Sequence, residues 1–410
     1  MREPACRFCS TVLRQSFVDL GATPLANSYL DLAKTIEAEP VYPLHARVCS
    51  RCRLVQVDAL AIPEEVFGNY AYFSSYSASW VEHARRYADS AISRWSLSPE
   101  SRVIEVASND GYLLQHFIAA GIPTLGIEPA ANVAEAARAK GVPTEVAFMG
   151  RETAKRLLAQ GNAADLIVAN NVLAHVPDIK DFVEGLRTIL KPFGVMSIEF
   201  PHLLRLIEGV QFDTIYHEHY SYLSLLAVER IVTTLGLRVF DVEELSTHGG
   251  SLRVWLCHAQ HEVPQESAGL QKVRADEAAA GFNTEAAYTG FQPRVQAVRD
   301  GFVRFLHEAR SAGRSVVGYG AAAKGNTLLN YCGIGPDLVR YVVDRNPHKQ
   351  GCLLPGSRIP IHAPERIAQT RPDYLLILPW NLKNEISAQM SEIRSWEGKF
   401  VTAIPEIAVW

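Results

Sequence analysis

Short apolar runs alternate with segments of helical period through the middle of the chain. The runs cover residues 102–107, 123–127, 165–169 and 194–198, and each is followed by polar residues. Buried strands that alternate with helices over this length predict a parallel, doubly wound sheet, because each crossover helix returns the chain to the same edge. We therefore expect an α/β protein with a central Rossmann-like domain over residues 76–245.

A second series of the same kind follows nearer the C-terminus. Residues 260–312 have the pattern of long amphipathic helices, and apolar runs at 314–319 and 374–378 then alternate with helical segments. This series predicts a second Rossmann-like domain over residues 246–410. Residues 1–75 lack the pattern, so we expect them to form a separate N-terminal module.

The N-terminal module holds four of the seven cysteines. They form two Cys-x-x-Cys pairs, Cys6 with Cys9 and Cys49 with Cys52, each in a turn-like segment beside strand-like residues. Two such turns place four thiolates around one tetrahedral zinc ion, in a closed site that leaves no position for catalysis. In a chain without an export signal, this spacing favours a structural zinc ion over disulfides. Free buried thiols are the alternative.

Composition narrows the range of functions. The chain has 410 residues, of which 48% are hydrophobic and 20% charged, and its formal charge of −4 argues against a nucleic-acid-binding surface. No apolar run is long enough to span a bilayer, and no charged and apolar leader begins the chain. We therefore expect a cytoplasmic protein with no membrane or nucleic-acid partner, and no obligatory protein partner is evident.

Polar residues at the ends of the central runs predict a cofactor site, since ligands of doubly wound sheets bind at the carboxyl ends of strands. Glu105 lies in the first run, Ser108-Asn109-Asp110-Gly111 follows it, and Glu128 ends the next run. A carboxylate at that distance suits the two hydroxyls of a ribose. Asn170 ends a third run. The single glycine of the loop favours a nucleoside without phosphate, such as S-adenosylmethionine (SAM); a helix-capping turn is the alternative.

The densest group of ionisable side chains is Tyr216-His217-Glu218-His219-Tyr220-Ser221-Tyr222. Two imidazoles beside a carboxylate suit proton transfer, because the unperturbed pKa of histidine lies near physiological pH. His217 and His219 could instead be metal ligands at alternate positions, although apart from Asp213 no partner lies close upstream. The group could also form a structural hydrogen-bond network. His175, at a strand-to-helix junction, belongs either to this site or to a turn.

Two further segments carry polar side chains that suit a substrate pocket. Tyr70, Tyr72 and Tyr76 lie in a strip rich in tyrosine and serine, which a hydroxyl-rich helix start explains equally well. The segment Thr247-His248-Gly249-Gly250-Ser251-Leu252-Arg253 allows close backbone approach and offers an arginine to a phosphate or a carboxylate. A strand-entry turn explains this second segment nearly as well.

The C-terminal series contains a formal dinucleotide fingerprint. The string Gly318-x-Gly320-x-x-Ala323 matches it, and Asp344 ends the next run at a suitable distance. Taken alone, the string predicts an NAD enzyme. Lys324 and Gly325 add a cation and a backbone amide that fit the diphosphate of any nucleotide. We therefore expect this domain to be another nucleotide-fold unit.

Taken together, these residues resemble the zinc-containing, SAM-dependent sugar C-methyltransferases, which include the 3-C-methyltransferases of branched deoxysugars such as mycarose and tetronitrose. The resemblance runs in order over nearly the whole chain, from the four cysteines through the motifs at 105–111, 126–129, 171–178, 216–221 and 247–253 to 318–325. It implies a zinc module, a central SAM domain, and a C-terminal Rossmann-like domain that helps to hold a nucleotide-linked sugar.

The resemblance also implies roles for individual residues. The catalytic groups would be His175, Tyr216, Glu218 and His219, with a tyrosine of the strip: Tyr70, Tyr72 or Tyr76. Apart from the resemblance, we expect Tyr76, Tyr222, His248, Arg253 and Lys324 to contribute to substrate binding. The resemblance, and not the geometry of an extended segment, selects His219 over His217 as the base.

The chemistry implied is carbon methylation. A carbon beside a carbonyl loses a proton to give an enolate, which can attack the methyl group of a sulfonium. We therefore expect methylation of the carbon α to the ketone of a nucleotide-linked keto-deoxysugar, with His219 as the base. Three alternatives stay open: a methyltransferase with another carbon, nitrogen or oxygen acceptor, an NAD-dependent oxidoreductase, and a zinc-knuckle adaptor without turnover.

Overall fold

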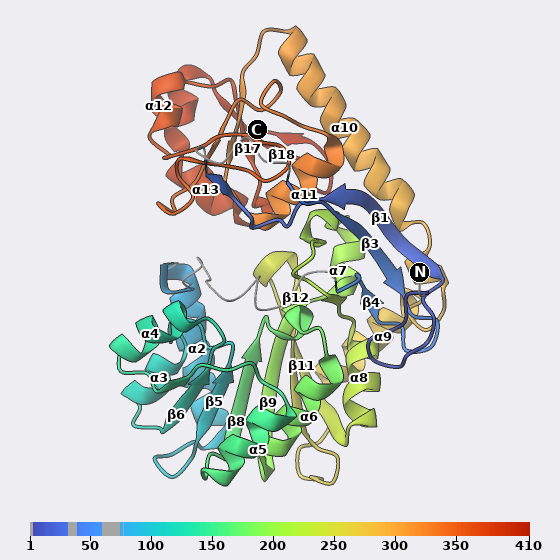
Figure 1. The fold of residues 1–410 in the computed structure, drawn as a ribbon, viewed down its shortest axis with the longest axis vertical. Helices are drawn as coiled ribbons and strands as arrows, with labels where there is room; N and C mark the ends of the chain where they lie inside the picture. The colour runs from blue at the N-terminus through green and yellow to red at the C-terminus, as the bar shows by residue number, and fades with distance from the viewer. Residues whose placement is uncertain (1–2, 32–38, 60–73, 77) are drawn as a thin grey trace.

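The computed structural model describes residues 3–31, 39–59, 74–76 and 78–410. It has three parts, each built around its own sheet. Figure 1 shows the central and C-terminal parts stacked along the long axis, with the N-terminal strands β1 and β3 lying beside the join. Within the described residues, no helix has both the length and the apolar character needed to cross a bilayer.

The central sheet has seven strands in the order β11-β12-β9-β8-β5-β6-β7. Their bounds are β5 (Val103–Val106), β6 (Thr124–Ile127), β7 (Thr144–Glu145), β8 (Ala164–Asn170), β9 (Leu190–Pro201), β11 (Leu237–Leu245) and β12 (Ser251–His258). Neighbours from β9 to β7 are parallel, whereas β12 runs antiparallel to β9 and β11. From β5 the chain adds β6 and β7 on one side of that strand, and it then crosses to add β8 on the opposite side of β5. Ligands of such sheets bind at this switch point.

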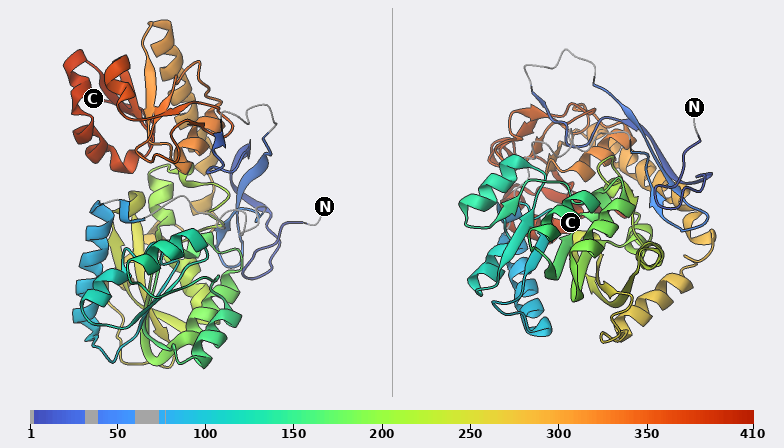
Figure 2. Two further views of the ribbon diagram at one scale, coloured as in Figure 1. Left: turned by 60° about the vertical axis from the view of Figure 1, so that its left-hand side comes forward. Right: turned by 60° about the horizontal axis from the view of Figure 1, so that its bottom comes forward.

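Helices cover both faces of the central sheet (Figure 2). They are α2 (Ala78–Trp95), α3 (Leu114–Ala119), α4 (Ala131–Ala139), α5 (Arg151–Ala159), α6 (Ile179–Ile189), α8 (Leu225–Thr234) and α9 (Ala268–Ala279). Helix α7 (Leu203–Glu208) instead packs in the apolar cluster shared by the N-terminal strands and the C-terminal part. Successive strand residues enter different apolar clusters, because strand side chains alternate between faces. Ile104 and Ile167 join the cluster that includes α6 and α8, while Val103 and Leu166 join the one that includes α2 and α3.

Strand β12 falls within residues 246–410, which the sequence pattern assigned to the C-terminal domain. In the structure it pairs with β9 from Ser251 to Cys257 and so belongs to the central sheet. Local sequence patterns do not predict this pairing, because a strand-entry turn does not reveal which sheet the strand joins. The C-terminal sheet begins only at β13.

The C-terminal sheet has six strands in the order β16-β14-β13-β17-β18-β19. Their bounds are β13 (Val316–Tyr319), β14 (Val342–Val343), β16 (Ile361–His362), β17 (Tyr374–Ile377), β18 (Lys399–Thr402) and β19 (Ala408–Val409), and only β19 is antiparallel. The associated helices are α10 (Phe291–Ser311), α11 (Ala323–Cys332), α12 (Arg366–Thr370) and α13 (Lys383–Gln389). Its switch point lies between β13 and β17.

The N-terminal sheet joins the other two parts. It contains β1 (Gln15–Thr23), β3 (Tyr42–Val48), β4 (Val55–Gln56) and β10 (Ser221–Tyr222), all antiparallel. Strand β10 comes from the polar segment 216–222, so this segment enters the N-terminal sheet directly. Strand β2 (Leu30–Asp31) pairs instead with β15 (Cys352–Leu353) of the C-terminal part. The three parts confirm the predicted α/β class, with an N-terminal four-cysteine module and two Rossmann-like units.

Candidate active site

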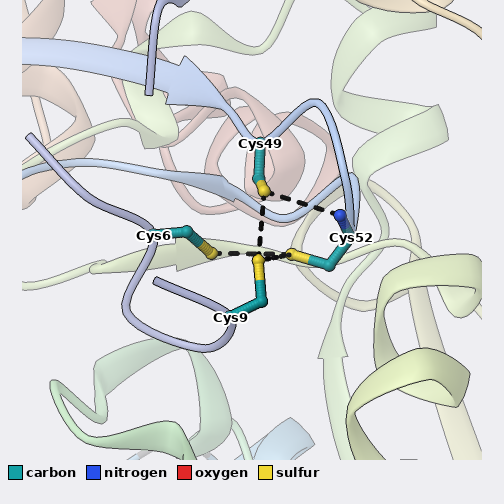
Figure 3. Close-up of side chains that lie close together, drawn as sticks. All are labelled: Cys6, Cys9, Cys49 and Cys52. Carbon is teal, nitrogen blue, oxygen red and sulfur yellow. Dashed lines mark hydrogen bonds between the residues drawn. The ribbon is translucent and has the colours of Figure 1, made fainter. Parts of the chain in front are cut away.

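The two cysteine pairs converge on one point of the N-terminal part (Figure 3). The four Sγ atoms lie within 4.8 Å of one another. Sγ of Cys9 is 3.4 Å from that of Cys49 and 3.7 Å from that of Cys52, and Cys6 is 3.5 Å from Cys52. Thiolates bound at about 2.3 Å to a tetrahedral zinc ion stand about 3.8 Å apart. The four sulfur atoms therefore fit a structural zinc ion.

The loop after β5 forms a cradle at the switch point of the central sheet. Asn109 and Gly111 have φ angles of 49° and 77°, so the backbone turns sharply there. Glu128, directly after β6, holds the loop: its Oε2 accepts a hydrogen bond from the backbone N–H of Asn109 at 3.0 Å, and its Oε1 from that of Ala130 at 2.9 Å. The carboxylate keeps further lone pairs for the hydroxyls of a ribose.

Three carboxylates surround this loop. Glu105 is 1% exposed, and burial together with the charges of Glu128 and Asp110 raises its pKa well above the usual value. Burial also raises the pKa of Glu128. Asp110 is paired with Lys140, whose Nζ lies 2.7 Å from Oδ2. The three carboxyl groups therefore supply hydrogen-bonding oxygen atoms around the loop, which suit a polar ligand.

Unpaired polar atoms gather at the same point. Among the residues that the structure describes, Glu105 Oε2, Ser108 Oγ, Asp110 Oδ1 and Asn170 Oδ1 are buried and have no hydrogen-bond partner. Asn170 is the last residue of β8, the strand beside β5 across the switch. An unpaired buried polar group costs about 1–3 kcal/mol, so these atoms mark a place where a polar ligand fits. The predicted cofactor residues are thus brought together.

His219 lies in the turn between η4 (Phe212–Thr214) and β10. Its Nδ1 is 2.8 Å from the carbonyl oxygen of Thr214, and its Nε2 is 2.8 Å from the hydroxyl of Tyr216. A carbonyl only accepts, so Nδ1 carries the proton and Nε2 accepts from the phenol. Burial holds the pKa of His219 well below its usual value, and nearby His175 adds to the effect. The ring is therefore neutral at physiological pH, with its lone pair at Nε2.

His175 stands beside His219 at the end of η3 (Leu173–His175), the turn that follows β8. The two rings meet edge to face, with centroids 4.6 Å apart. Nδ1 of His175 donates to the carbonyl oxygen of Glu218 at 2.8 Å, and burial lowers the pKa of His175 to about 4. Its Nε2 is therefore an acceptor. The backbone N–H of Tyr216 donates to the hydroxyl of Tyr222 at 3.2 Å, which places Tyr222 in the same cluster.

Glu218 is held by a residue that the sequence reasoning missed. Nδ2 of Asn27 donates to both of its carboxylate oxygens, at 2.8 and 2.9 Å. Burial raises the pKa of Glu218 to about 7, while the Asn27 hydrogen bond and the charge of Lys349 oppose that rise. Asn27 lies in the loop between the two cysteine pairs. No local signal marks an asparagine whose partner is 191 positions away.

Lys324 approaches the site from the C-terminal part, in the first turn of α11. Its Nζ donates to Oδ1 of Asn381 at 2.8 Å and lies 4.8 Å from the centre of the Trp380 ring. The indole N–H of Trp380 donates to Oδ2 of Asp213 at 2.8 Å. The ammonium group of Lys324 is therefore held by Trp380 and Asn381 in the loop after β17.

His248 joins the same surroundings. It lies in the short turn η5 (Thr247–Gly249) and meets the Trp80 ring edge to face, with centroids 5.5 Å apart. Burial lowers its pKa to about 4, and the charge of Lys324 adds to that effect. The structure thus brings His248 and Lys324 into one electrostatic environment.

Arg253 is placed differently. It is 6% exposed, its Nη2 lies 3.1 Å from Glu199 and its Nη1 2.9 Å from Glu243. The guanidinium also covers the Tyr87 ring, at 4.6 Å from its centre. Because two carboxylates already occupy it, the idea that Arg253 binds a substrate phosphate loses its main support.

Part of the tyrosine strip lies outside the described residues: Tyr70, Tyr72 and the side chain of Tyr76. The neighbouring serines contact the cofactor loop. The backbone N–H of Ser74 donates to Oδ1 of Asn109 at 2.8 Å, and the hydroxyl of Ser75 donates to Asp110. Ser74 and Ser75, which belong to the strip, therefore reach the loop that follows β5.

The fingerprint Gly318-x-Gly320-x-x-Ala323 adopts the expected strand, turn and helix, but side chains of the chain itself occupy the turn. The backbone N–H of Ala321 donates to Oδ2 of Asp344 at 2.8 Å. The carbonyl oxygen of Ala321 accepts from the hydroxyl of Tyr29 at 2.6 Å and from Nζ of Lys349 at 2.7 Å. The turn is therefore satisfied internally.

Three family models match successive parts of the chain. They are described as "Putative zinc binding domain" over residues 6–67, "Methyltransferase domain" over 80–242 and "C-methyltransferase C-terminal domain" over 246–405. The C-methyltransferase NovU of Streptomyces niveus is 36% identical over 403 residues, which cover 98% of this chain and 95% of NovU. The chain belongs to the zinc-binding, SAM-dependent C-methyltransferases.

Other similarities cover only the central part. A ubiquinone biosynthesis O-methyltransferase of Rhodopseudomonas palustris is 25% identical over 149 residues, which cover 31% of this chain and 59% of that protein. A crystal structure of magnesium protoporphyrin IX methyltransferase from Synechocystis PCC 6803 with bound SAH matches 43% of this chain and 83% of its own, at 15% identity and a TM-score of 0.34.

Membership of the family confirms four predictions: the chain is an enzyme, it transfers a methyl group, SAM is its cofactor and zinc its metal. The 36% identity with NovU, which extends over 98% of this chain, also decides against two alternatives: that the chain is an NAD-dependent oxidoreductase, and that it is a zinc-knuckle adaptor without turnover. The identity of the acceptor and the role of each residue remain to be proposed.

Proposed function

We propose that this enzyme methylates the carbon α to the ketone of a nucleotide-linked keto-deoxysugar, with His219 as the base. The observation that carries the proposal is the fixed tautomer of His219. Its Nδ1 donates to the Thr214 carbonyl at 2.8 Å, so the lone pair lies at Nε2; it accepts from the Tyr216 hydroxyl in the structure and would take the substrate proton once the substrate replaces that contact. Second partners of this kind orient a histidine and increase its basicity.

The proton transfer creates the nucleophile. The α-carbon–hydrogen bond breaks, the proton goes to Nε2 of His219, and the electron pair passes into the enolate. Bound SAM would supply the electrophilic methyl group: the bond from the enolate carbon to the methyl group forms as the methyl–sulfur bond breaks, and S-adenosylhomocysteine leaves as a neutral thioether. A positioned base of this kind contributes about 10²–10⁴-fold to the rate.

Two neighbours would stabilise and orient the substrate. The Tyr216 hydroxyl donates to Nε2 of His219 at 2.8 Å in the structure, and once Nε2 takes the substrate proton this hydroxyl would turn to donate to the enolate oxygen. His175 is neutral and accepts at Nε2, so we assign it the orientation of a substrate hydroxyl rather than donation to the enolate. Glu218, held by Asn27, would bind another hydroxyl of the sugar.

The nucleotide diphosphate would lie against Lys324. This cation stands in the first turn of the ten-residue helix α11, whose free N–H groups also favour an anion. Lys324 belongs to the C-terminal part, whereas His175 follows the central strand β8. The proposed acceptor therefore bridges the two parts.

The test separates proton removal from methyl transfer. A nucleotide-linked keto-deoxysugar is incubated in D₂O without SAM, and deuterium at the α-carbon is followed by NMR. We expect exchange with the wild type and at least 100-fold slower exchange with His219→Asn, with SAM affinity unchanged. His175→Asn is the comparison variant: it should weaken binding of the sugar but retain exchange at saturating sugar. Exchange at the wild-type rate in His219→Asn would remove His219 from the role, and retained exchange there with loss in His175→Asn would transfer the role to His175.

The acceptor class is tested with labelled SAM and a panel of such sugars. The proposal expects a new carbon–methyl signal beside the ketone. A methyl group found on oxygen or nitrogen would overturn carbon methylation of the sugar.

A further inference from the structure

Arg7 lies inside the first zinc knuckle, between the ligands Cys6 and Cys9. Its side chain leaves the knuckle and contacts the segment that contains the catalytic cluster. Nη2 donates to the carbonyl oxygen of Tyr220 and to Oγ of Ser221, the latter at 3.0 Å, and Nη1 donates to the carbonyl oxygen of Val57. One guanidinium therefore holds both strands of the β4–β10 pair.

The carbonyl held by Arg7 belongs to the residue next to His219. The same oxygen of Tyr220 also accepts from the backbone N–H of Val57 at 3.1 Å. The guanidinium lies 5.6 Å from the centre of the Tyr220 ring, whose side chain is fully buried. These contacts fix the backbone at the end of the turn that presents His219.

The other end of Arg7 is tied to a zinc ligand. Its backbone N–H donates to Oε1 of Gln56 at 3.0 Å, and Nε2 of Gln56 donates to Sγ of Cys6 at 3.3 Å. Gln56 also pairs with Ser221 in the β4–β10 ladder. A short chain of contacts thus runs from a thiolate to the catalytic segment.

The charge of Arg7 has an unusual environment. Its hydrogen bonds go to the neutral oxygens of Val57, Tyr220 and Ser221, and none of the ion pairs between described residues includes it. Four thiolates around one Zn²⁺ would carry a net charge of about −2, so an occupied zinc site would supply the compensating charge. A guanidinium suits this position because its planar fork reaches several carbonyls at once.

We infer that Arg7 is a positioning residue, through which the zinc site holds the segment 216–222 and so places His219. Zinc binding then has a consequence at the active site without any zinc chemistry in the reaction. Only the kinetic consequence rests on the proposed function; the structural link does not.

Hydrogen exchange followed by mass spectrometry tests the link directly. Arg7→Met should raise exchange at least tenfold in peptides covering 55–57 and 216–222, and leave peptides covering 103–128 unchanged. Arg51→Met is the matched control, because Arg51 occupies the second knuckle but is exposed. Zinc content should be the same in both variants. Exchange at the wild-type rate over 216–222 in Arg7→Met would overturn the inference.

Arg7→Lys keeps the charge but loses the fork, and it decides the matter should Arg7→Met not fold. We expect the same local rise in exchange, smaller in size, because one ammonium cannot hold both strands. An unchanged pattern in Arg7→Lys, or a uniform rise over the whole chain, contradicts the link.

Kinetics add a readout that general destabilisation would not give. Loss of an outer contact of this type costs about 10–100-fold in activity. We expect kcat to fall by that factor in Arg7→Met, with the Kd for SAM and the KM for the acceptor within about twofold of wild type. A fall in SAM affinity equal to the fall in kcat would show that Arg7 merely supports the fold. Raised local exchange with normal kcat would keep the link and contradict the role of the segment in catalysis.

Discussion

The two Rossmann-like units of this enzyme treat their switch points in opposite ways. In the central unit, Glu128 braces the loop after β5, and buried polar atoms such as Glu105 Oε2 and Ser108 Oγ have no partner among the described residues. In the C-terminal unit, Asp344 braces the turn after β13 in the same manner, but Tyr29 and Lys349 satisfy that turn from within the chain. The switch point of the central unit thus has buried polar atoms that a ligand could satisfy, whereas side chains of the protein already satisfy the switch point of the C-terminal unit.

The glycines of the fingerprint show the same difference. A Cβ at Gly320 would lie 2.5 Å from Cδ of Pro379, so the glycine is needed for packing of the chain against itself. The comparison teaches that a glycine fingerprint identifies a fold, whereas unpaired buried polar atoms identify a ligand site. In the proposed function, the C-terminal unit instead contributes Lys324, which directly follows the fingerprint, to the active site.

The largest expected effect is on SAM affinity. Glu128→Ala removes the side chain that holds the loop after β5 and the expected acceptor for the ribose hydroxyls, and two hydrogen bonds to a charged group are worth about 3–6 kcal/mol. We expect the Kd for SAM, measured by calorimetry, to rise at least 100-fold. Asp344→Ala is the matched change in the C-terminal unit and should leave that Kd unchanged. Equal losses in both variants would erase the distinction between the units.

The next effect concerns the acceptor. Lys324→Ala removes the cation proposed to bind the diphosphate, and we expect the KM for the nucleotide-linked sugar to rise about 10–100-fold, as for a lost charge-assisted contact. The Kd for SAM should not change, because Lys324 belongs to the other unit. A normal KM would leave the C-terminal unit without a part in binding.

The pH dependence should report Glu218, which lies where the parts meet. Burial raises the pKa of Glu218 to about 7, so its carboxylate form is lost as the pH falls through 7. We expect kcat/KM to fall on that acid side. Asn27→Ala removes a hydrogen bond to the carboxylate, so the pKa rises further and the acid limb moves to higher pH by about one unit. In Glu218→Gln the limb should disappear; its persistence would assign it to another group.

The smallest effect on ligands is expected at Gly320. Gly320→Ala should lower the free energy of unfolding by about 1–3 kcal/mol, because its φ is +89° and Pro379 is in the way. Chemical denaturation measures this loss. SAM affinity should stay normal, and a specific loss of SAM binding would show that the fingerprint serves the cofactor.

Local patterns were enough to predict the sheet and the metal site. Apolar runs such as 103–106 and 165–169 are short, and each ends in polar residues, so strand identity and the ligand edge followed from the chain itself. The spacing of Cys6, Cys9, Cys49 and Cys52 likewise carried the zinc site. The roles of His219 and its neighbours came from the family resemblance, since an extended heptapeptide does not distinguish one imidazole from another.

Long-range contacts were beyond the sequence. Asn27 meets Glu218 only because the N-terminal module folds against the central part, and Arg7 meets Tyr220 across 213 positions. The charge of Arg253 favours a phosphate as its partner when the sequence alone is considered. Its partner in the structure is Glu199 on the adjacent strand β9, and only the antiparallel pairing of β12 with β9 identifies that contact. All three contacts depend on which parts of the folded chain pack against one another, and local sequence patterns do not contain that information.

The most direct test of the account is a crystal structure of the enzyme with S-adenosylhomocysteine and a nucleotide-linked sugar. The account predicts the adenosine in the central unit with its ribose hydroxyls on Glu128, and the acceptor carbon beside Nε2 of His219. Adenosine bound at Gly318–Ala323, or an acceptor carbon separated from His219 by packed apolar side chains, would contradict it.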